Sequence, residues 1–185
     1  MFDEKEVVAK ILKSDTRAFE LLVKQYERLV FFVVKRMVTE QEDIEDICQE
    51  VFIKVYQSIN RFMFQSRLST WIARIAYLTA INHLKKNKKH KPGDNMADVD
   101  NYHFTTDDPE YLLTKKDASA YINYPVEQMP PQYKTVLTLY HLNEFSYQEI
   151  EEITGMPEGT IKNYLFRARK LLKQKLETYL QNELI

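Results

Sequence analysis

The chain has 185 residues, and 26 Lys and Arg against 27 Asp and Glu give it a formal net charge of −1. This balance excludes a bulk polycation, so any affinity for nucleic acid must come from where the basic residues lie. Only three Gly and few strand-like alternations indicate an all-α protein, and 22 Tyr and Phe indicate packed cores. Cys48 alone cannot form an internal disulfide, and Leu29–Val34 is too short to span a bilayer. With no signal peptide recognised, we expect a cytoplasmic protein that is not inserted in a membrane.

Two helices are expected at the start of the chain. The first covers Glu4–Lys13, and Ser14 or Asp15 can cap the second, which runs to about Val38. Apolar residues of the second helix recur at spacings of three and four, as on a core-facing side. These residues are Phe19, Leu22, Val23, Tyr26, Val30, Val33, Val34 and Met37.

The third expected helix is acidic, and a capping box over Thr39–Glu42 predicts its start. Asp43, Asp46 and Glu50 share one face, opposite an apolar stripe of Ile44, Ile47, Val51 and Val55. The residues alone allow three interpretations. The favoured one is a solvated N-terminal half, since acids suit the first turns of a helix. The others are a docking face for a basic protein surface and a metal-dependent nuclease site, for which no convergent partner is visible.

Asn60–Arg67 breaks the helical pattern and carries two aromatic residues that look exposed, Phe62 and Phe64. Ser66 is the expected N-cap of the next helix, roughly Leu68 to Lys89. Its apolar positions are Trp71, Ile72, Ile75, Leu78 and Leu84, with Trp71 expected as a core anchor. Five Lys between Lys85 and Lys91 fit either a solvated tail or a surface that follows phosphates beside an aromatic loop.

The next segment, residues 91–108, is polar and has no apolar period, so we expect a linker. Helices are expected to restart at Asp108–Pro109 and again at Pro130–Pro131. The predicted architecture is therefore two small helical domains, residues 1–90 and 109–185, joined by a polar linker. The four His are scattered, with no Cys or His at ligand spacing, so we expect neither zinc nor a cofactor.

The C-terminal domain contains a helix-turn-helix pattern. Ser146 and Glu149 form a capping box, Gly155 ends a short helix, and Pro157 suits the start of the next. An apolar stripe follows on this last helix: Ile161, Leu165, Ala168, Leu172 and Leu176. Helix, short turn with Gly, helix is the arrangement of this motif.

Charge distinguishes this last helix. Between Gly159 and Leu176 there are no acids and six basic residues: Lys162, Arg167, Arg169, Lys170, Lys173 and Lys175. One interpretation is a solvated basic face near a helix C-terminus, and the other is DNA binding. The basic residues begin in the N-terminal half, where a recognition helix contacts bases, which favours DNA. Lys162, Asn163 and Arg167 are then expected to face base edges. Arg169, Lys170 and Lys173 are expected to face phosphates or solvent.

The order of these pieces resembles the extracytoplasmic-function group of sigma factors of bacterial RNA polymerase. The matching segments are Asp43–Tyr56, Arg61–Ala76, Met129–Lys162 and Arg167–Leu172. They cover nearly the whole chain in the right order, on both sides of the linker. The resemblance implies a non-enzymatic subunit that binds core RNA polymerase, recognises promoter DNA and opens it, often held by an anti-sigma factor. The alternative is a free-standing helix-turn-helix regulator, which needs no acidic docking helix.

The resemblance also implies roles for residues, and it moves the acidic face of the third helix to polymerase docking. The polymerase-binding residues are Asp43, Asp46, Gln49 and Glu50. The minus-ten DNA residues are Phe62, Phe64, Ser66, Arg67, Trp71, Leu78, Lys85 and Lys86. The minus-thirty-five DNA residues are Thr160, Lys162, Asn163, Phe166, Arg167, Arg169 and Lys170. Leu78 stands where the family often has Asn, and Asn163–Leu165 replaces Ser-Arg-Leu. We therefore expect the chain to recognise its own promoter sequence.

Overall fold

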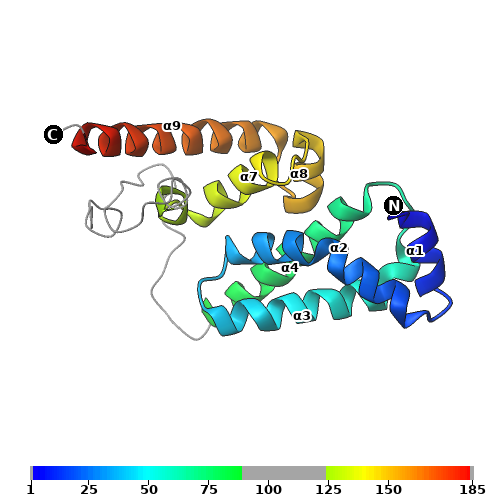
Figure 1. Ribbon diagram of the computed structural model, residues 1–185. Helices are drawn as coiled ribbons and strands as arrows, with labels where there is room; N and C mark the ends of the chain where they lie inside the picture. The colour runs from blue at the N-terminus through cyan, green and yellow to red at the C-terminus, as the bar shows by residue number, and fades with distance from the viewer. Residues whose placement is uncertain (1, 89–123, 184–185) are drawn as a thin grey trace.

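The computed structural model describes residues 2–88 and 124–183, and every regular element in these ranges is a helix. This confirms the all-α prediction for the described part of the chain. The longer helices are α1 (Glu4–Ile11), α2 (Thr16–Lys35), α3 (Gln41–Ser58), α4 (Leu68–Lys88), α7 (Pro131–His141), α8 (Tyr147–Thr154) and α9 (Glu158–Glu183). Figure 1 shows α1–α4 as one bundle, with α7–α9 stacked on it. The expected linker and the helix start at Asp108–Pro109 lie outside the described residues.

Some helix starts follow from local sequence as predicted. Asp15, one of the two candidates, caps α2, and its carboxylate accepts the backbone N–H of Arg17 at 3.0 Å. Ser146 and Glu149 form the predicted capping box at α8. Gly155 ends α8 with a φ of +73°, the left-handed conformation that favours glycine.

Two predicted caps are wrong. The N-cap of α3 is Glu40, one residue after Thr39, and its side chain makes no capping hydrogen bond. At α4 the Trp71 N–H donates to the Arg67 carbonyl at 3.1 Å, which places Arg67, not Ser66, at the N-cap position. Both helices start without the predicted caps because burial of an apolar face supplies most of a helix's stability in a protein.

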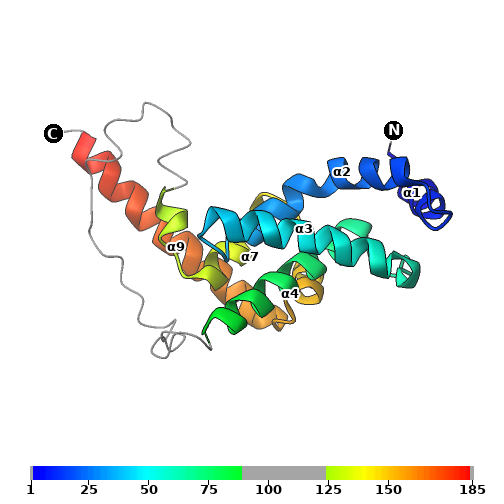
Figure 2. The same ribbon diagram turned by 90° about the horizontal axis from the view of Figure 1, so that it is seen from below.

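The N-terminal bundle buries the faces that the periodicity predicted. Leu22, Val30 and Val34 of α2 and Val51 and Val55 of α3 are fully enclosed. Helix α4 packs against both, and Figure 2 shows the three helices lying side by side. Two residues are exceptions: Leu78 of α4, expected among the apolar positions, is 44% exposed, and Leu12, expected on the apolar side of the first helix, is 54% exposed.

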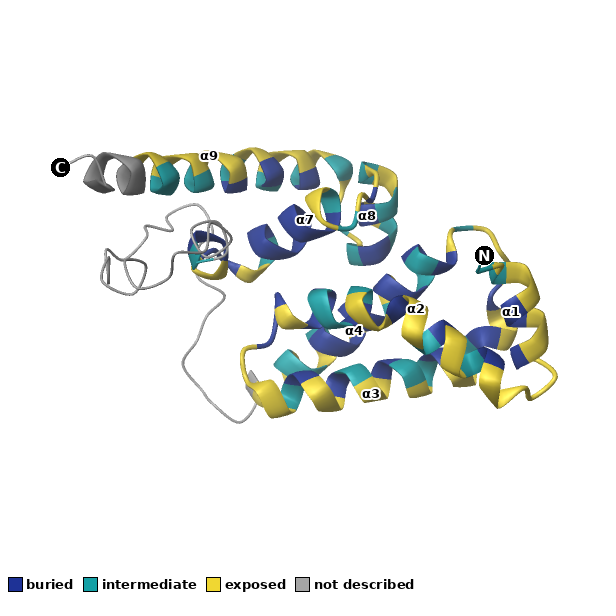
Figure 3. Cartoon of the chain, viewed as in Figure 1, coloured by how far each residue is buried: buried dark blue, intermediate teal, exposed yellow. Residues whose placement is uncertain are grey.

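The C-terminal group has the predicted helix-turn-helix. Ile161, Leu165 and Ala168 of α9 are buried against α7 and α8, while the outer edge of α9 is exposed (Figure 3). Leu172 and Leu176 continue the stripe as half-buried residues. The predicted apolar stripe therefore faces inward, and the basic residues lie around the rest of the helix.

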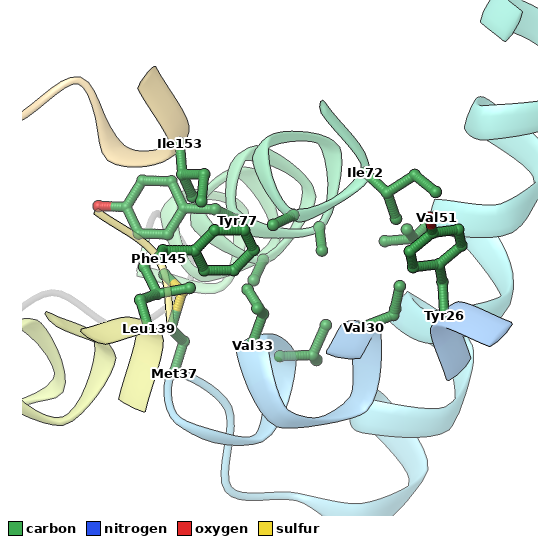
Figure 4. Packing of buried hydrophobic residues seen from close by; sticks show 14 of the residues in the cluster. Tyr26, Val30, Val33, Met37, Val51, Ile72, Tyr77, Leu139, Phe145 and Ile153 are labelled. Atoms are coloured by element: carbon green, nitrogen blue, oxygen red, sulfur yellow. The ribbon is translucent and has the colours of Figure 1, made fainter. Parts of the chain in front are cut away.

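A continuous apolar core joins the two groups of helices. Met37 of the N-terminal bundle and Tyr77 of α4 meet Leu139, Phe145 and Ile153 of the C-terminal group (Figure 4). All five side chains are less than a tenth exposed. The C-terminal group is thus packed against α2 and α4, and this packing decides what surface each half presents.

Candidate nucleic-acid interface

The exposed face of α9 carries most of the predicted minus-thirty-five residues. Phe166 is 68% exposed, so its ring is open to solvent. Lys162, Asn163, Arg169 and Lys170 are also exposed. Thr160 and Arg167 are half-buried. A solvent-facing aromatic residue among cations offers apolar contact to a base and charge to the backbone of a duplex.

Intrahelical partners hold several of these side chains. Lys162 forms an ion pair with Glu158, one turn earlier. Arg167 donates from Nε to the Asn163 side-chain oxygen at 3.1 Å. An exposed i, i+4 ion pair such as Lys162–Glu158 contributes only about 0.3–0.5 kcal/mol, so a phosphate can displace Glu158 from Lys162. Glu158 thus lies just before the stretch without acids, Gly159 to Leu176, and its carboxylate reaches Lys162 inside that stretch.

The aromatic loop has one ring inside and one outside. Phe62 is 8% exposed, so the expectation that it is a surface residue is wrong. Its ring packs 5.1 Å from the half-buried Trp71 and 4.7 Å from Phe64, measured between centroids. Phe64 is 42% exposed and has a φ of +55°, a costly conformation for a residue other than glycine. Phe62 thus supports the loop, and Phe64 is the ring available to a ligand. Ser66 is half-buried beside it.

The two basic ends of α4 face solvent. Arg67 at the start and Lys85 and Lys86 near the end are exposed, while the last Lys residues of the run lie outside the described residues. The exposed side of Leu78 belongs to a shallow groove between α3 and α4. The side chains lining this groove are Lys54, Gln57, Ser58, Arg61, Ile75, Leu78, Thr79 and Asn82. Lys54 and Arg61 were not predicted, because their cationic groups reach Leu78 only through helix packing.

Two acidic side chains of α3 have partners within the chain. His83 Nε2 lies 3.2 Å from the Asp43 carboxylate, and Lys54 Nζ lies 2.7 Å from Glu50. Asp46 and Gln49 are exposed. Seven residues after Asp46, on the same face, Ile53 is 55% exposed. The exposed face of α3 therefore carries acids near its start and the apolar Ile53 further along. The spacing of seven residues between Asp46 and Ile53 is a sequence signal that could have revealed Ile53.

Helix α8 lies against the start of α4, directly after the aromatic loop. The Thr70 hydroxyl donates to the Glu149 carboxylate at 3.0 Å, and an Arg67 guanidinium nitrogen lies 3.5 Å from the same group. Arg74 donates to the backbone carbonyl of Glu152. Residues nearly 80 positions apart thus meet beside the loop, which no local pattern could predict.

At the other end of this contact, two cations are enclosed. Arg36 is 5% exposed, pairs with Glu127, and donates from Nε to the Thr138 hydroxyl at 2.9 Å. Lys134 is 7% exposed, and burial lowers its pKa although Glu127 opposes this. Two buried basic side chains thus share the Glu127 carboxylate, which links the end of α2 to α7.

Three further features of the described residues concern metal ligands, the thiol and membrane spans. In residues 2–88 and 124–183 no three His, Cys, Asp or Glu side chains converge as a metal site requires. The Cys48 thiol is half-buried, and burial raises its pKa to about 11. Within the same ranges, no helix is both long enough and apolar enough to cross a bilayer.

Comparison with known proteins gives the family. Residues 22–90 match the family described as "Sigma-70 region 2", and residues 126–172 match "Sigma-70, region 4". The ECF RNA polymerase sigma-E factor of Haemophilus influenzae is 33% identical over 94% of this chain and 95% of its own. The RNA polymerase sigma-H factor of Pseudomonas aeruginosa is 30% identical over 96% of both chains. This chain belongs to the ECF sigma factors of RNA polymerase.

Solved structures show the same fold. A sigma factor of Bartonella quintana, crystallised with the anti-sigma factor NepR, aligns with 86% of this chain and 96% of its own. The TM-score is 0.65 at 18% identity. CnrH, in complex with the cytosolic domain of CnrY, aligns with 95% of this chain and 97% of its own, with a TM-score of 0.64 at 13% identity. The sigma-factor fold thus covers both helical groups. Sigma factors are non-catalytic regulators that direct RNA polymerase to promoters.

Proposed function

We propose that this ECF sigma factor divides its work between its two helical domains and itself makes or breaks no covalent bond. Residues 1–90 bind core RNA polymerase and open the minus-ten element. Residues 109–185 read the minus-thirty-five element, and residues 91–108 link the two. The observation that carries the proposal is the exposed face of α9, where the ring of Phe166 stands among exposed cations, on the side of the helix away from its buried Ile161, Leu165 and Ala168.

Reading of the minus-thirty-five element is assigned to α9. Asn163 and Phe166 lie on its exposed side and can meet base edges and thymine methyl groups in the major groove. Arg169 and Lys170 contact phosphates. Contacts with base edges carry sequence preference, and contacts with phosphates supply affinity that falls as the salt concentration rises.

Opening of the minus-ten element is assigned to the aromatic loop and the neighbouring face of α4. Phe64 is exposed and rests on Phe62, which rests in turn on Trp71, so an unstacked base can pack on a ring that is held in place. Unstacking costs a few kcal/mol, which stacking and backbone contacts must offset. Lys85 and Lys86 supply cations for the strand that is displaced.

Polymerase docking is assigned to the acidic face of α3. Asp46 and Gln49 are exposed, Asp43 and Glu50 have partners within the chain that can exchange, and Ile53 adds an apolar anchor. Interfaces that bind well combine such an anchor with a polar rim. An anti-sigma factor is a further expected partner, since a relative of the same fold was solved with one. The proposed place of action is the cytoplasm, with the polymerase.

The test is run-off transcription on a genomic promoter library, using bacterial core RNA polymerase with and without this chain. Specific new starts are expected. Asp46→Arg should reduce them about tenfold or more through charge reversal at the docking face. Glu20→Arg makes the same charge change on the exposed side of α2 and should leave them unchanged. Wild-type binding to DNA duplex without new starts would instead favour the free-standing regulator. If the wild-type chain gave neither new starts nor DNA binding, both the sigma-factor function and the free-standing regulator would be ruled out.

A further inference from the structure

Four side chains form a continuous stack along one edge of α9: two belong to α9 itself, one to α7 and one to α8. The rings of Tyr140, at the end of α7, and Tyr147, at the start of α8, are stacked with centroids 5.1 Å apart and planes 17° apart. Lys162 Nζ lies 5.3 Å from the centroid of Tyr147. The guanidinium carbon of Arg169 lies 5.3 Å from the centroid of Tyr140. We call this cation–ring–ring–cation series the ladder.

The ladder matches the geometry of α9. Lys162 and Arg169 are seven residues apart, which is nearly two full turns and about 10.5 Å along the helix axis. Both therefore leave the same edge of α9, the edge that faces α7 and α8. The two rings, with centroids 5.1 Å apart, stack along that edge, and each ring contacts one of the two cations. Asn163 and Lys170 each follow one residue later, about 100° further round the helix, and lie outside the ladder.

Both cations have a second contact, and the two rings also interact through their hydroxyl groups. The Arg169 Nε donates to His141 Nε2 at 3.1 Å, and Lys162 is also paired with Glu158. A hydrogen bond with Tyr140 contributes most to raising the pKa of Tyr147. The two rings are half-buried, while Lys162 and Arg169 remain exposed. The cations are thus held in place without being enclosed.

We propose that Tyr140 and Tyr147 are positioning residues of the DNA-reading surface: their stacked rings hold Lys162 and Arg169 at the edge of α9 in the geometry that duplex DNA meets. This inference rests on the proposed function and extends it to two residues on other helices. A free Lys or Arg loses rotamer freedom when it binds, and a ring that restricts it beforehand reduces that cost. The rings act through the cations and need no contact with DNA.

The test measures binding of the full chain to a short duplex that the wild-type chain selects from a random library, over a range of salt concentrations. Tyr140→Leu and Tyr147→Leu should each weaken binding about two- to fivefold, the range of one exposed cation–π contact. Tyr140→Leu should also lower the logarithmic salt slope by about 0.9, because one phosphate contact is lost. Tyr140→Phe keeps the ring and should bind within about twofold of wild type.

Coupling separates positioning from simple packing. Tyr140→Leu should have no further effect on affinity or salt slope when Arg169 is already Ala, although each single change is harmful. Equal losses for Tyr140→Phe and Tyr140→Leu would show that the hydroxyl acts directly and would overturn the proposal. So would independent losses in the double variant, or Leu variants that bind like wild type. A wild-type chain that selects no duplex would overturn the proposed reading function and the ladder together.

Discussion

The contact between α4 and α8 leads to a prediction about promoter binding. Under the proposed function the aromatic loop opens the minus-ten element and α9 reads the minus-thirty-five element, whose names place them about 25 base pairs apart, or about 85 Å along a B-form duplex. In the structure Arg74 of α4 touches the backbone of Glu152 in α8. Following the chain outward from this contact, Phe64 and Lys162 can be separated by about 60 Å at most. The two helical groups must therefore separate before both elements are bound together.

Locking this contact should block initiation while leaving α9 free. The variant carries Cys48→Ala, Arg74→Cys and Glu152→Cys, and a short bis-maleimide with a reducible centre joins the two new thiols. Because the geometry then forbids simultaneous engagement, we expect promoter affinity and run-off yield to fall about 100-fold. Binding of the minus-thirty-five duplex alone should be unchanged, since the exposed face of α9 is turned away from α4.

Two controls accompany this experiment. Reduction of the cross-link should restore run-off transcription with the same preparation. A matched cross-link between Glu6→Cys and Lys10→Cys, which lie one turn apart within α1, should have no effect. If the locked protein starts transcription as well as the reduced protein, the separation argument is wrong and both elements can be read from the packed arrangement.

Three further predictions concern stability and the reading face. Ser146→Ala should lower the free energy of unfolding by about 0.5–2 kcal/mol, because the α8 cap is lost. Ile150→Ala, at a fully buried site, should lower it by about 2–5 kcal/mol. Chemical denaturation measures both, and a larger loss for Ser146→Ala than for Ile150→Ala would contradict this ranking. Partial burial works to raise the pKa of Glu149, but hydrogen bonds from Ser146 and Thr70 outweigh it and place the pKa below its ordinary value of 4.5. The ionised carboxylate thus stabilises the fold above pH 4.5, so the advantage in thermal midpoint of wild type over Glu149→Gln should shrink as the pH falls below that value, and a constant difference would refute it. Phe166→Ala should weaken binding to the selected duplex without changing the salt slope, because a ring carries no charge; a changed slope would show that it acts through a neighbouring cation.

Local sequence determined the features whose causes lie within one turn of helix. The capping box of Ser146 and Glu149, the left-handed Gly155 and the apolar stripe of α9 were all predictable, because each depends on residues three or four apart. The same logic gave the buried faces of α2 and α3. It was wrong at Thr39, where a correct local pattern was present but the helix began one residue later.

Only the tertiary structure decided which of two similar residues is covered. Phe62 and Phe64 are equally apolar, yet Phe62 is buried because Trp71 of α4 lies over it. Leu78 looked like a core residue, yet it faces the groove between α3 and α4. Periodicity gives the direction of a side chain around its own helix, but which directions are covered depends on the neighbouring helices.

The composite surfaces depend on the tertiary structure for the same reason. The sequence indicated a basic recognition helix, but not that Tyr140 and Tyr147 stack beside it, since α7 and α8 must pack before the rings meet and α9 must pack on both before its cations reach them. It indicated a capping role for Glu149, but not the Thr70 contact 79 residues away. Local interactions fix the helices and their polar and apolar faces. Contacts between residues far apart in the chain fix the surfaces those helices build together.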